Sequence, residues 1–130
     1  MKKACDFLKE CGVFYLATME GDQPRVRPFG ALAIFEDKLY IMTGNIKPVF
    51  AQISRNPKIE ICACKGDTWI RIAADAVIDS RFEARKAMLD QNPDLRAMYD
   101  ENDGNIEVMY LGNAKAVLSS FVAAPEVWEF

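Results

Sequence analysis

The stretch that decides the fold is residues 13–43, which read VFYLATM EGDQP RVRPFGALAIF EDK LYIMT. Three runs rich in β-branched and aromatic residues are separated by two short polar turns. This spacing predicts antiparallel strands over residues 13–19, 25–35 and 39–43. Pro28 has no N–H to donate and Gly30 has no side chain to pack, so we expect the second strand to break or bend near them.

The rest of the chain predicts short helices and three more strands. Apolar periodicity and turn residues indicate helices over residues 4–11, 48–55 and 82–91, a short helical piece from Pro93, and strands over residues 59–64, 68–79 and 106–122. Ser80 and Glu83 have the spacing of a capping box at the start of the third helix. On the last strand, alternation groups Val108, Tyr110, Gly112, Ala114, Ala116 and Leu118 on one face. The pattern indicates an α+β, mainly β fold, a six-stranded antiparallel barrel with short flanking helices in one domain over residues 1–130.

Composition excludes several kinds of chemistry. The chain has no histidine, which argues against an imidazole base, a histidine-held haem and zinc sites. No Cys-x-x-Cys pair occurs; Cys62 and Cys64 are expected to be small buried residues on one side of a strand, with a redox pair as the alternative. No apolar run approaches the roughly 20 residues of a membrane-spanning helix, and acidic residues interrupt the N-terminal region where a signal peptide needs an apolar core. We therefore expect a cytoplasmic protein without a membrane partner.

One cluster of residues suits an anion. The net charge is −3, but the middle of the chain is basic and its C-terminal half is acidic. Arg25 and Arg27 lie two apart on a predicted strand, so both point to one face, where two guanidinium groups suit a phosphate. Lys47 stands just before a predicted helix, whose free N–H groups also favour an anion, and Thr43 and Asn45 add neutral donors. These residues predict a phosphate monoester site, with a solvated basic surface as the alternative.

In these segments the chain resembles the pyridoxamine 5′-phosphate oxidase-like family of FMN-binding split barrels. The resemblance covers nearly the whole chain and rests on the order and spacing of its parts. These parts are the opening helix, the strand at residues 13–18, the segments Arg25–Phe29 and Leu39–Lys47, and Gln52–Ile61, where a helix ends in Asn-Pro before a β-branched strand. The resemblance implies a split β-barrel, FMN as the cofactor, and a homodimer with two FMN molecules at its interface.

The resemblance also implies which residues bind the cofactor. They are Arg25, Val26, Arg27, Pro28, Met42, Thr43, Gly44, Asn45, Lys47, Pro48, Trp69 and Arg71. The first four would line the isoalloxazine ring and the ribityl chain, whereas Thr43, Asn45 and Lys47 would hold the phosphate. Trp69 and Arg71 would approach the flavin, from the same or the other subunit; the alternative is a barrel aromatic and a surface charge. No residue is predicted to be catalytic or to bind a metal, because a flavin itself performs hydride and electron chemistry.

The chain departs from the namesake enzyme because it lacks the C-terminal Arg-x-His segment that grips pyridoxal phosphate, so oxidation of pyridoxamine phosphate is not expected. The favoured function is an FMN-dependent oxidoreductase that passes electrons from a small-molecule donor, such as a reduced nicotinamide, to a small organic acceptor. The alternatives are a non-catalytic flavin-binding protein and a deazaflavin-dependent reductase. A barrel that binds single-stranded nucleic acid is disfavoured by the acidic balance of the chain.

Overall fold

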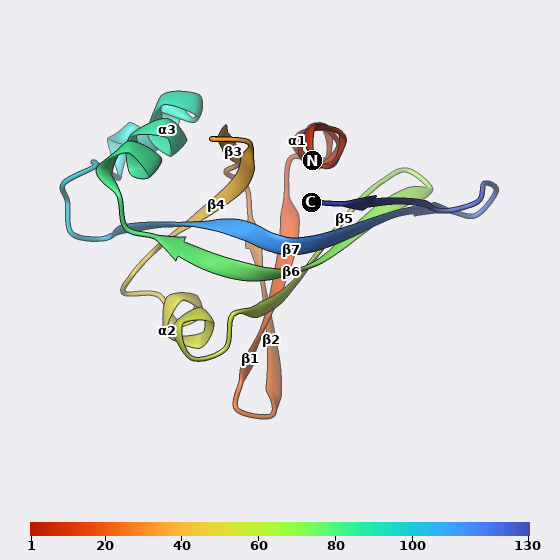
Figure 1. The fold of residues 1–130 in the computed structure, drawn as a ribbon, viewed down its shortest axis with the longest axis horizontal. Helices are drawn as coiled ribbons and strands as arrows, with labels where there is room; N and C mark the ends of the chain where they lie inside the picture. The colour runs from red at the N-terminus through yellow and green to blue at the C-terminus, as the bar shows by residue number, and fades with distance from the viewer.

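An antiparallel sheet of eight strands organises the chain, and three α-helices and a 3₁₀ helix pack around it (Figure 1). The computed structural model describes all of residues 1–130. In chain order the elements are α1 (Lys2–Cys11), β1 (Phe14–Glu20), β2 (Gln23–Phe29), β3 (Ala33–Phe35), β4 (Lys38–Gly44), α2 (Pro48–Arg55), β5 (Lys58–Lys65), β6 (Thr68–Asp79), α3 (Phe82–Gln91), the 3₁₀ helix η1 (Pro93–Ala97), β7 (Ile106–Ser120) and β8 (Glu126–Glu129).

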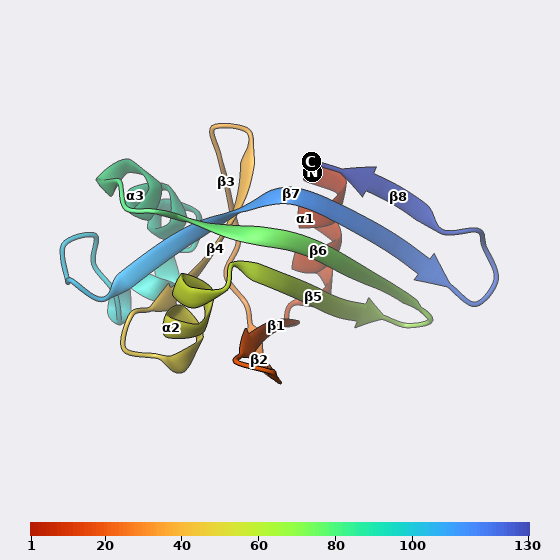
Figure 2. The same ribbon diagram turned by 60° about the horizontal axis from the view of Figure 1, so that its bottom comes forward.

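The strands follow the order β2-β1-β5-β6-β7-β4-β3, and β8 pairs with β7 off this path. The mainly β, antiparallel prediction is confirmed, but the count of six strands is wrong. The predicted strand 25–35 divides in two: β2 ends at Phe29 and β3 pairs only with β4. β8 is the other added strand, and it brings the C-terminus beside the start of α1 (Figure 2). No hydrogen-bonded pairing joins β2 to β3, so the sheet is not closed.

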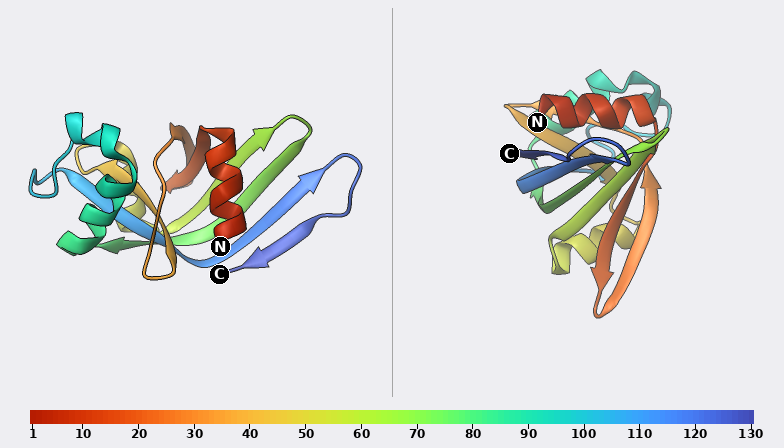
Figure 3. Two further views of the ribbon diagram at one scale, coloured as in Figure 1. Left: turned by 90° about the horizontal axis from the view of Figure 1, so that it is seen from above. Right: turned by 90° about the vertical axis from the view of Figure 1, so that its right-hand side faces the viewer.

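Buried side chains form two groups on opposite faces of β4. Leu39 and Ile41 belong to the main core, to which α1 and α2 also contribute, and α1 packs over β5 and β6 (Figure 3). Tyr40 and Met42 point the other way, into a smaller core beneath α3. β4 is therefore covered on both faces, as its apolar sequence requires. No helix of the structure has the length and apolar character needed to cross a bilayer.

A bulge changes which residues of β7 face the core. The register with β6 shifts between Ala73 and Asp75, and Asn113 has a positive φ of 48°. Met109 and Leu111 are buried before the shift, whereas Ala114 and Ala116 are buried after it. An extra residue in one strand reverses the alternation beyond it. The single face predicted from Val108 to Leu118 is therefore wrong.

The cysteines of β5 face solvent. Cys62 and Cys64 are exposed, while the neighbouring Ile61 and Ala63 are buried in the main core. The expectation that both thiols are buried is wrong, although both lie on one side of the strand as predicted. The apolar run misled because it does not reveal which face of the strand packs on the core, and Ile59, Ile61 and Ala63 take the core positions.

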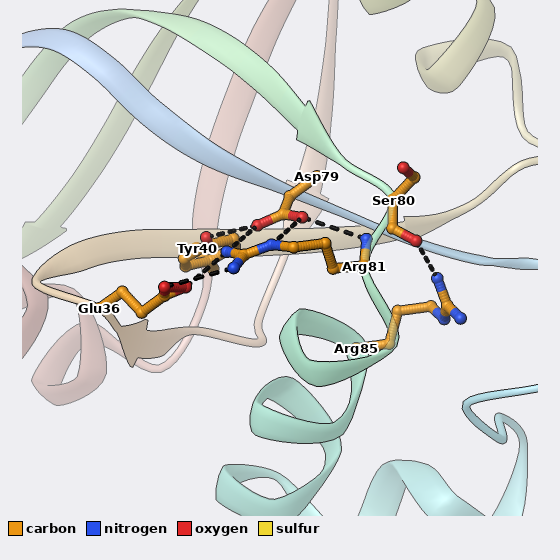
Figure 4. A network of polar contacts seen from close by, with 6 residues as sticks. All are labelled: Glu36, Tyr40, Asp79, Ser80, Arg81 and Arg85. Atoms are coloured by element: carbon orange, nitrogen blue, oxygen red, sulfur yellow. Dashed lines mark hydrogen bonds and ion pairs between the residues drawn. The ribbon is translucent and has the colours of Figure 1, made fainter.

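Arg81 clamps the start of α3 to the sheet (Figure 4). Its Nη2 lies 2.5 Å from Glu36 Oε1 and 2.9 Å from Asp79 Oδ2, and the Tyr40 hydroxyl donates to Asp79 Oδ2 at 2.7 Å. The predicted capping box does not form, because Arg81 is the N-cap residue and no side chain caps the helix. Ser80 instead offers its carbonyl to Arg85 Nη1 at 2.6 Å.

The other end of α3 is fastened to the edge strand β3. Gln91 accepts from the Ile34 N–H at 3.0 Å and donates to the Ile34 carbonyl at 2.9 Å, so its amide mimics a paired strand. Asn92 Nδ2 donates to the Leu32 carbonyl at 2.9 Å. These bonds cover polar groups that an open edge would leave unpaired. Held at both ends, α3 fixes the position of η1.

The contacts of Asp79 with Arg81 and Tyr40 predict that the stability of the protein depends on pH. Hydrogen bonds from Arg81, and to a smaller extent from Tyr40, outweigh burial and lower the pKa of Asp79 to about 2. The unfolded value is about 3.9, so this contribution is present above about pH 4 and is lost as the pH falls through about 2. Asp79→Asn should remove at most about 2.5 kcal/mol at neutral pH and flatten the acid limb of the unfolding free energy, measured in urea. Asp22→Asn, in an exposed turn, is the control; equal acid limbs in wild type and Asp79→Asn would contradict the assignment.

Candidate functional site

Two adjoining clefts lie beside β2 and the start of α2. The first, of about 530 Å³, lies between β2, β4 and the α3–η1 segment. The second, of about 590 Å³, lies between the β1–β2 hairpin and α2. Both are lined by Arg27, Pro28, Lys47 and Val49, so these residues form a common border. Each cleft is within the size range of small-molecule sites, roughly 300–1,000 Å³.

The structure gathers most of the predicted cofactor-binding residues here. Those that line at least one cleft are Arg25, Val26, Arg27, Pro28, Met42, Thr43, Lys47 and Pro48. They come from β2, from the end of β4 and from the start of α2. Segments about twenty residues apart in the sequence therefore meet at one place. Four predicted residues, Gly44, Asn45, Trp69 and Arg71, line neither cleft.

Arg27 is half-buried on the common border and is held by neutral oxygens. Its Nη1 donates to Thr18 Oγ1 at 2.7 Å and to the Leu16 carbonyl at 3.2 Å, and its Nη2 donates to Gln52 Oε1 at 2.5 Å. Burial, and then the nearby charge of Arg25, lower its pKa below the ordinary arginine value. A guanidinium stays protonated even so, which leaves a fixed positive charge beside the clefts.

Arg25 is placed differently from Arg27. It is exposed and forms an ion pair with Glu20, with 2.9 Å between Nη2 and Oε1. The pairing register sets Arg25 opposite Thr18 and Arg27 opposite Leu16, so the two arginines share a face as predicted. Because Arg25 already has a carboxylate partner, Arg27 is the more available cation for an anionic ligand.

Lys47 stands at the N-cap of α2, with Pro48 as the first helical residue. Its side chain is exposed and forms no ion pair. Free N–H groups at a helix start and a nearby ammonium group both favour negative charge. This end of the clefts therefore suits a phosphate, the chemistry predicted for it from the sequence.

Gly44 and Asn45 shape the loop before α2. A Cβ on Gly44 would lie 2.9 Å from Asn105 Oδ1, so glycine permits the close approach of the two loops. Asn45 Nδ2 donates to the Gly104 carbonyl at 2.7 Å, and its backbone N–H donates to the Asn105 carbonyl at 2.8 Å. Both residues therefore tie the loop to the start of β7, and the Asn45 amide is occupied by protein.

Trp69 and Arg71 lie near the start of β6, away from both clefts. Trp69 packs on Phe121 with 5.1 Å between the ring centroids. Arg71 is exposed, opposite Cys62 on one side and Val117 on the other. Within one chain these residues are not brought to Arg27 or Lys47.

Sequence reasoning missed two groups of site residues. Thr18 and Gln52, which hold Arg27, are polar residues on otherwise apolar faces, with 2% and 5% of their surface exposed. That position was a usable signal, since buried polar groups need partners. The other group is the far wall of the first cleft, formed by Gln91, Asn92, Pro93, Asp94, Leu95, Met98 and Tyr99. Only tertiary packing brings this wall opposite β2.

Comparison with known proteins shows to which family the chain belongs. Residues 1–93 match the pyridoxamine 5′-phosphate oxidase family profile. The chain belongs to this family. The matched region contains the whole near side of the clefts, from Arg25 to Gln52, whereas residues 94–99 of the far wall lie beyond it. No curated protein sequence matches the chain.

Solved structures agree with the family assignment. A NimC/NimA family protein from Clostridium acetobutylicum is 45% identical, with a TM-score of 0.97 over 100% of this chain and 92% of that one. A pyridoxamine 5′-phosphate oxidase-related, FMN-binding protein from Nostoc punctiforme PCC 73102 is 14% identical, with a TM-score of 0.66 over 99% and 95% of the two chains. A haem-binding protein from Mycobacterium smegmatis is 13% identical, with a TM-score of 0.64 over 94% and 57%. At such low identity the last two share the fold alone.

Proposed function

We propose that this member of the family binds FMN in the two adjoining clefts and works as a cytoplasmic, FMN-dependent oxidoreductase on a small organic substrate. The observation that carries the proposal is the pair of unneutralised cations, Arg27 and Lys47, on the border that the clefts share. The FMN-binding relative from Nostoc supports the choice of flavin. The four cysteines form no disulfide, which suits a reducing compartment.

The residues present fit FMN at both of its ends. Lys47 and the start of α2 offer positive charge and free N–H groups to the phosphate. Val26, Pro28 and Met42 offer apolar surface to a flat ring, and 69% of the Val26 surface is exposed. Arg27 lies on the border that the two clefts share and would offer donors to the ring or the ribityl chain.

Bound FMN would supply the hydride and electron chemistry, so the chain need not provide a nucleophile or an acid–base group. Lys47 binds and orients the phosphate. Arg27 holds a positive charge that favours negative charge on the ligand, and that preference raises the reduction potential of a bound flavin. The far wall of the first cleft faces these residues, and the electron donor and the acceptor would bind in turn beside the flavin.

We further propose that the protein is a homodimer formed through the outer face of the sheet. One row of directly opposed residues crosses six strands on that face: Pro28, Tyr15, Cys62, Arg71, Val117 and Val127. Tyr15 and Val127 each keep 51% of their surface exposed, so the row presents apolar groups to solvent. Because Pro28 also lines both clefts, a second copy on this face would approach the cofactor and could supply Trp69 and Arg71 to it.

The dimer is tested by light scattering during size-exclusion chromatography. Wild type should elute with twice the mass of one chain, and Tyr15→Lys should shift it towards the monomer because it buries a charge in the interface. Lys3→Ala, on the exposed side of α1, should leave the mass unchanged. A monomeric wild type would refute the proposal.

Cofactor binding is tested by the visible spectrum of the purified protein and by titration of the flavin-free protein with FMN. We expect a flavin spectrum, released FMN, and reduction of the bound flavin by a nicotinamide donor with reoxidation by an organic acceptor. Flavin that binds but never turns over would indicate a non-catalytic binding protein. Binding of a deazaflavin in preference to FMN, or of no flavin at all, would overturn the proposal.

The phosphate assignment predicts a selective effect of Lys47→Ala. A hydrogen bond to a charged group contributes about 1.5–3 kcal/mol, so FMN affinity should fall roughly 10- to 100-fold. Riboflavin, which lacks the phosphate, should bind the variant almost as it binds wild type. Both dissociation constants are measured by quenching of flavin fluorescence, with Lys3→Ala as the control. Equal losses for both ligands would remove Lys47 from the phosphate site.

A further inference from the structure

We propose that Gln52 is a positioning residue that aims Arg27 at the clefts without neutralising its charge. The inference rests on the proposed FMN site and goes beyond it, since it assigns a role to a residue of the buried face of α2. Gln52 is 5% exposed and belongs to the wall of the second cleft.

The hydrogen bonds of Gln52 fix the orientation of its amide. Its Oε1 accepts from Arg27 Nη2 and from Thr18 Oγ1, each at 2.5 Å. Its Nε2 donates to Glu20 Oε2 at 3.4 Å. With the amide reversed, N–H groups would face the guanidinium, which has donors only. The oxygen of Gln52 is therefore committed to Arg27.

The same contacts leave part of the Arg27 guanidinium free. Thr18, the Leu16 carbonyl and Gln52 occupy Nη1 and one N–H of Nη2. Nε–H and the second N–H of Nη2 make no hydrogen bond to protein. A guanidinium donates in fixed directions, so holding some of its donors determines where the others point. Arg27 lines both clefts, which places the free donors beside a ligand there.

The neutrality of Gln52 preserves the positive charge. Arg27 has no ion-pair partner, and the carboxylate of this network, Glu20, is already paired with Arg25 at 2.9 Å. A glutamate at position 52 would offer a carboxylate at the same distance and cancel the charge. A leucine would leave the charge but free Nη2, while Nη1 would stay held by Thr18 and the Leu16 carbonyl. An amide is the side chain of this length that holds Arg27 and leaves its charge available.

A merely structural role for Gln52 is the competing explanation. Gln52 and Thr18 are both buried polar residues, and their mutual hydrogen bond would be needed in any fold that placed them together. That role would make Gln52 matter for stability alone. It would leave the rotation of the Arg27 guanidinium insensitive to the choice of substitution, whereas the potential of bound FMN would still respond to a charge introduced at position 52.

The experiment compares Gln52→Glu with Gln52→Leu in the full-length protein. Reduced flavin carries more negative charge than oxidised flavin, so Gln52→Glu should weaken binding of reduced FMN about tenfold relative to oxidised FMN. For a two-electron couple this ratio lowers the potential by about 30 mV. Gln52→Leu should change the potential less. Ser54→Glu adds the same charge to the exposed side of α2 and is the matched control. An unchanged potential in Gln52→Glu would overturn the proposal.

A second measurement uses the flavin-free protein. In nitrogen-15 NMR spectra, the Arg27 guanidinium of wild type and of Gln52→Glu should rotate slowly and give separate Nη signals. In Gln52→Leu only the bonds at Nη1 remain, so the guanidinium should rotate faster and its Nη signals should broaden or merge. A rigid Arg27 in Gln52→Leu would show that Gln52 does not position it. If wild type bound no FMN, the proposed function would fail while this measurement would still decide whether Gln52 holds Arg27.

Discussion

The burial of β4 on both faces is the constraint on which the rest of the structure depends. Leu39 and Ile41 pack into the main core, while Tyr40 and Met42 pack beneath α3. A strand enclosed in this way cannot shift its register without moving two cores at once. Its C-terminal end is consequently fixed in space, and the chain turns there at Gly44 into the loop and helix that carry Lys47. The clefts lie where this enclosed strand ends.

Two neighbouring arginines contribute differently to the charge at the site, because their hydrogen-bond partners differ in charge. Arg25 meets a carboxylate at the surface, whereas Arg27 meets a hydroxyl, a carbonyl and an amide in a half-buried position. Neutral acceptors satisfy hydrogen bonds without cancelling charge, and the lower dielectric of a buried position strengthens the attraction for an anion. In this chain, the attraction of Arg27 for an anion therefore depends on Thr18 and Gln52, two polar residues set into apolar surfaces.

Much of the fold could be predicted from the sequence, because local signals decided it. Pro48 and Asn56 bound α2 where expected, and α3 spans Phe82–Gln91 as predicted, although the capping box that suggested its start does not form. The failures arose where distant segments set the outcome. The bulge opposite Ala73 and Asp75 reversed the alternation of β7, and pairing with β7 turned residues 126–129 into an eighth strand. A sequence pattern does not contain the register of a partner strand.

For the site, the sequence by itself determined the chemistry of the near side: the paired arginines of β2 and the lysine before α2 follow from strand alternation and helix-start signals. Tertiary structure alone decided that Arg27 donates to Thr18 and Gln52, that the Asn45 amide is occupied in the loop, and that residues 91–95, 98 and 99 face β2. The physical reason is the distance along the chain over which each effect acts. Periodicity and capping act between near neighbours, whereas a cleft is the space left when segments far apart in the chain pack together.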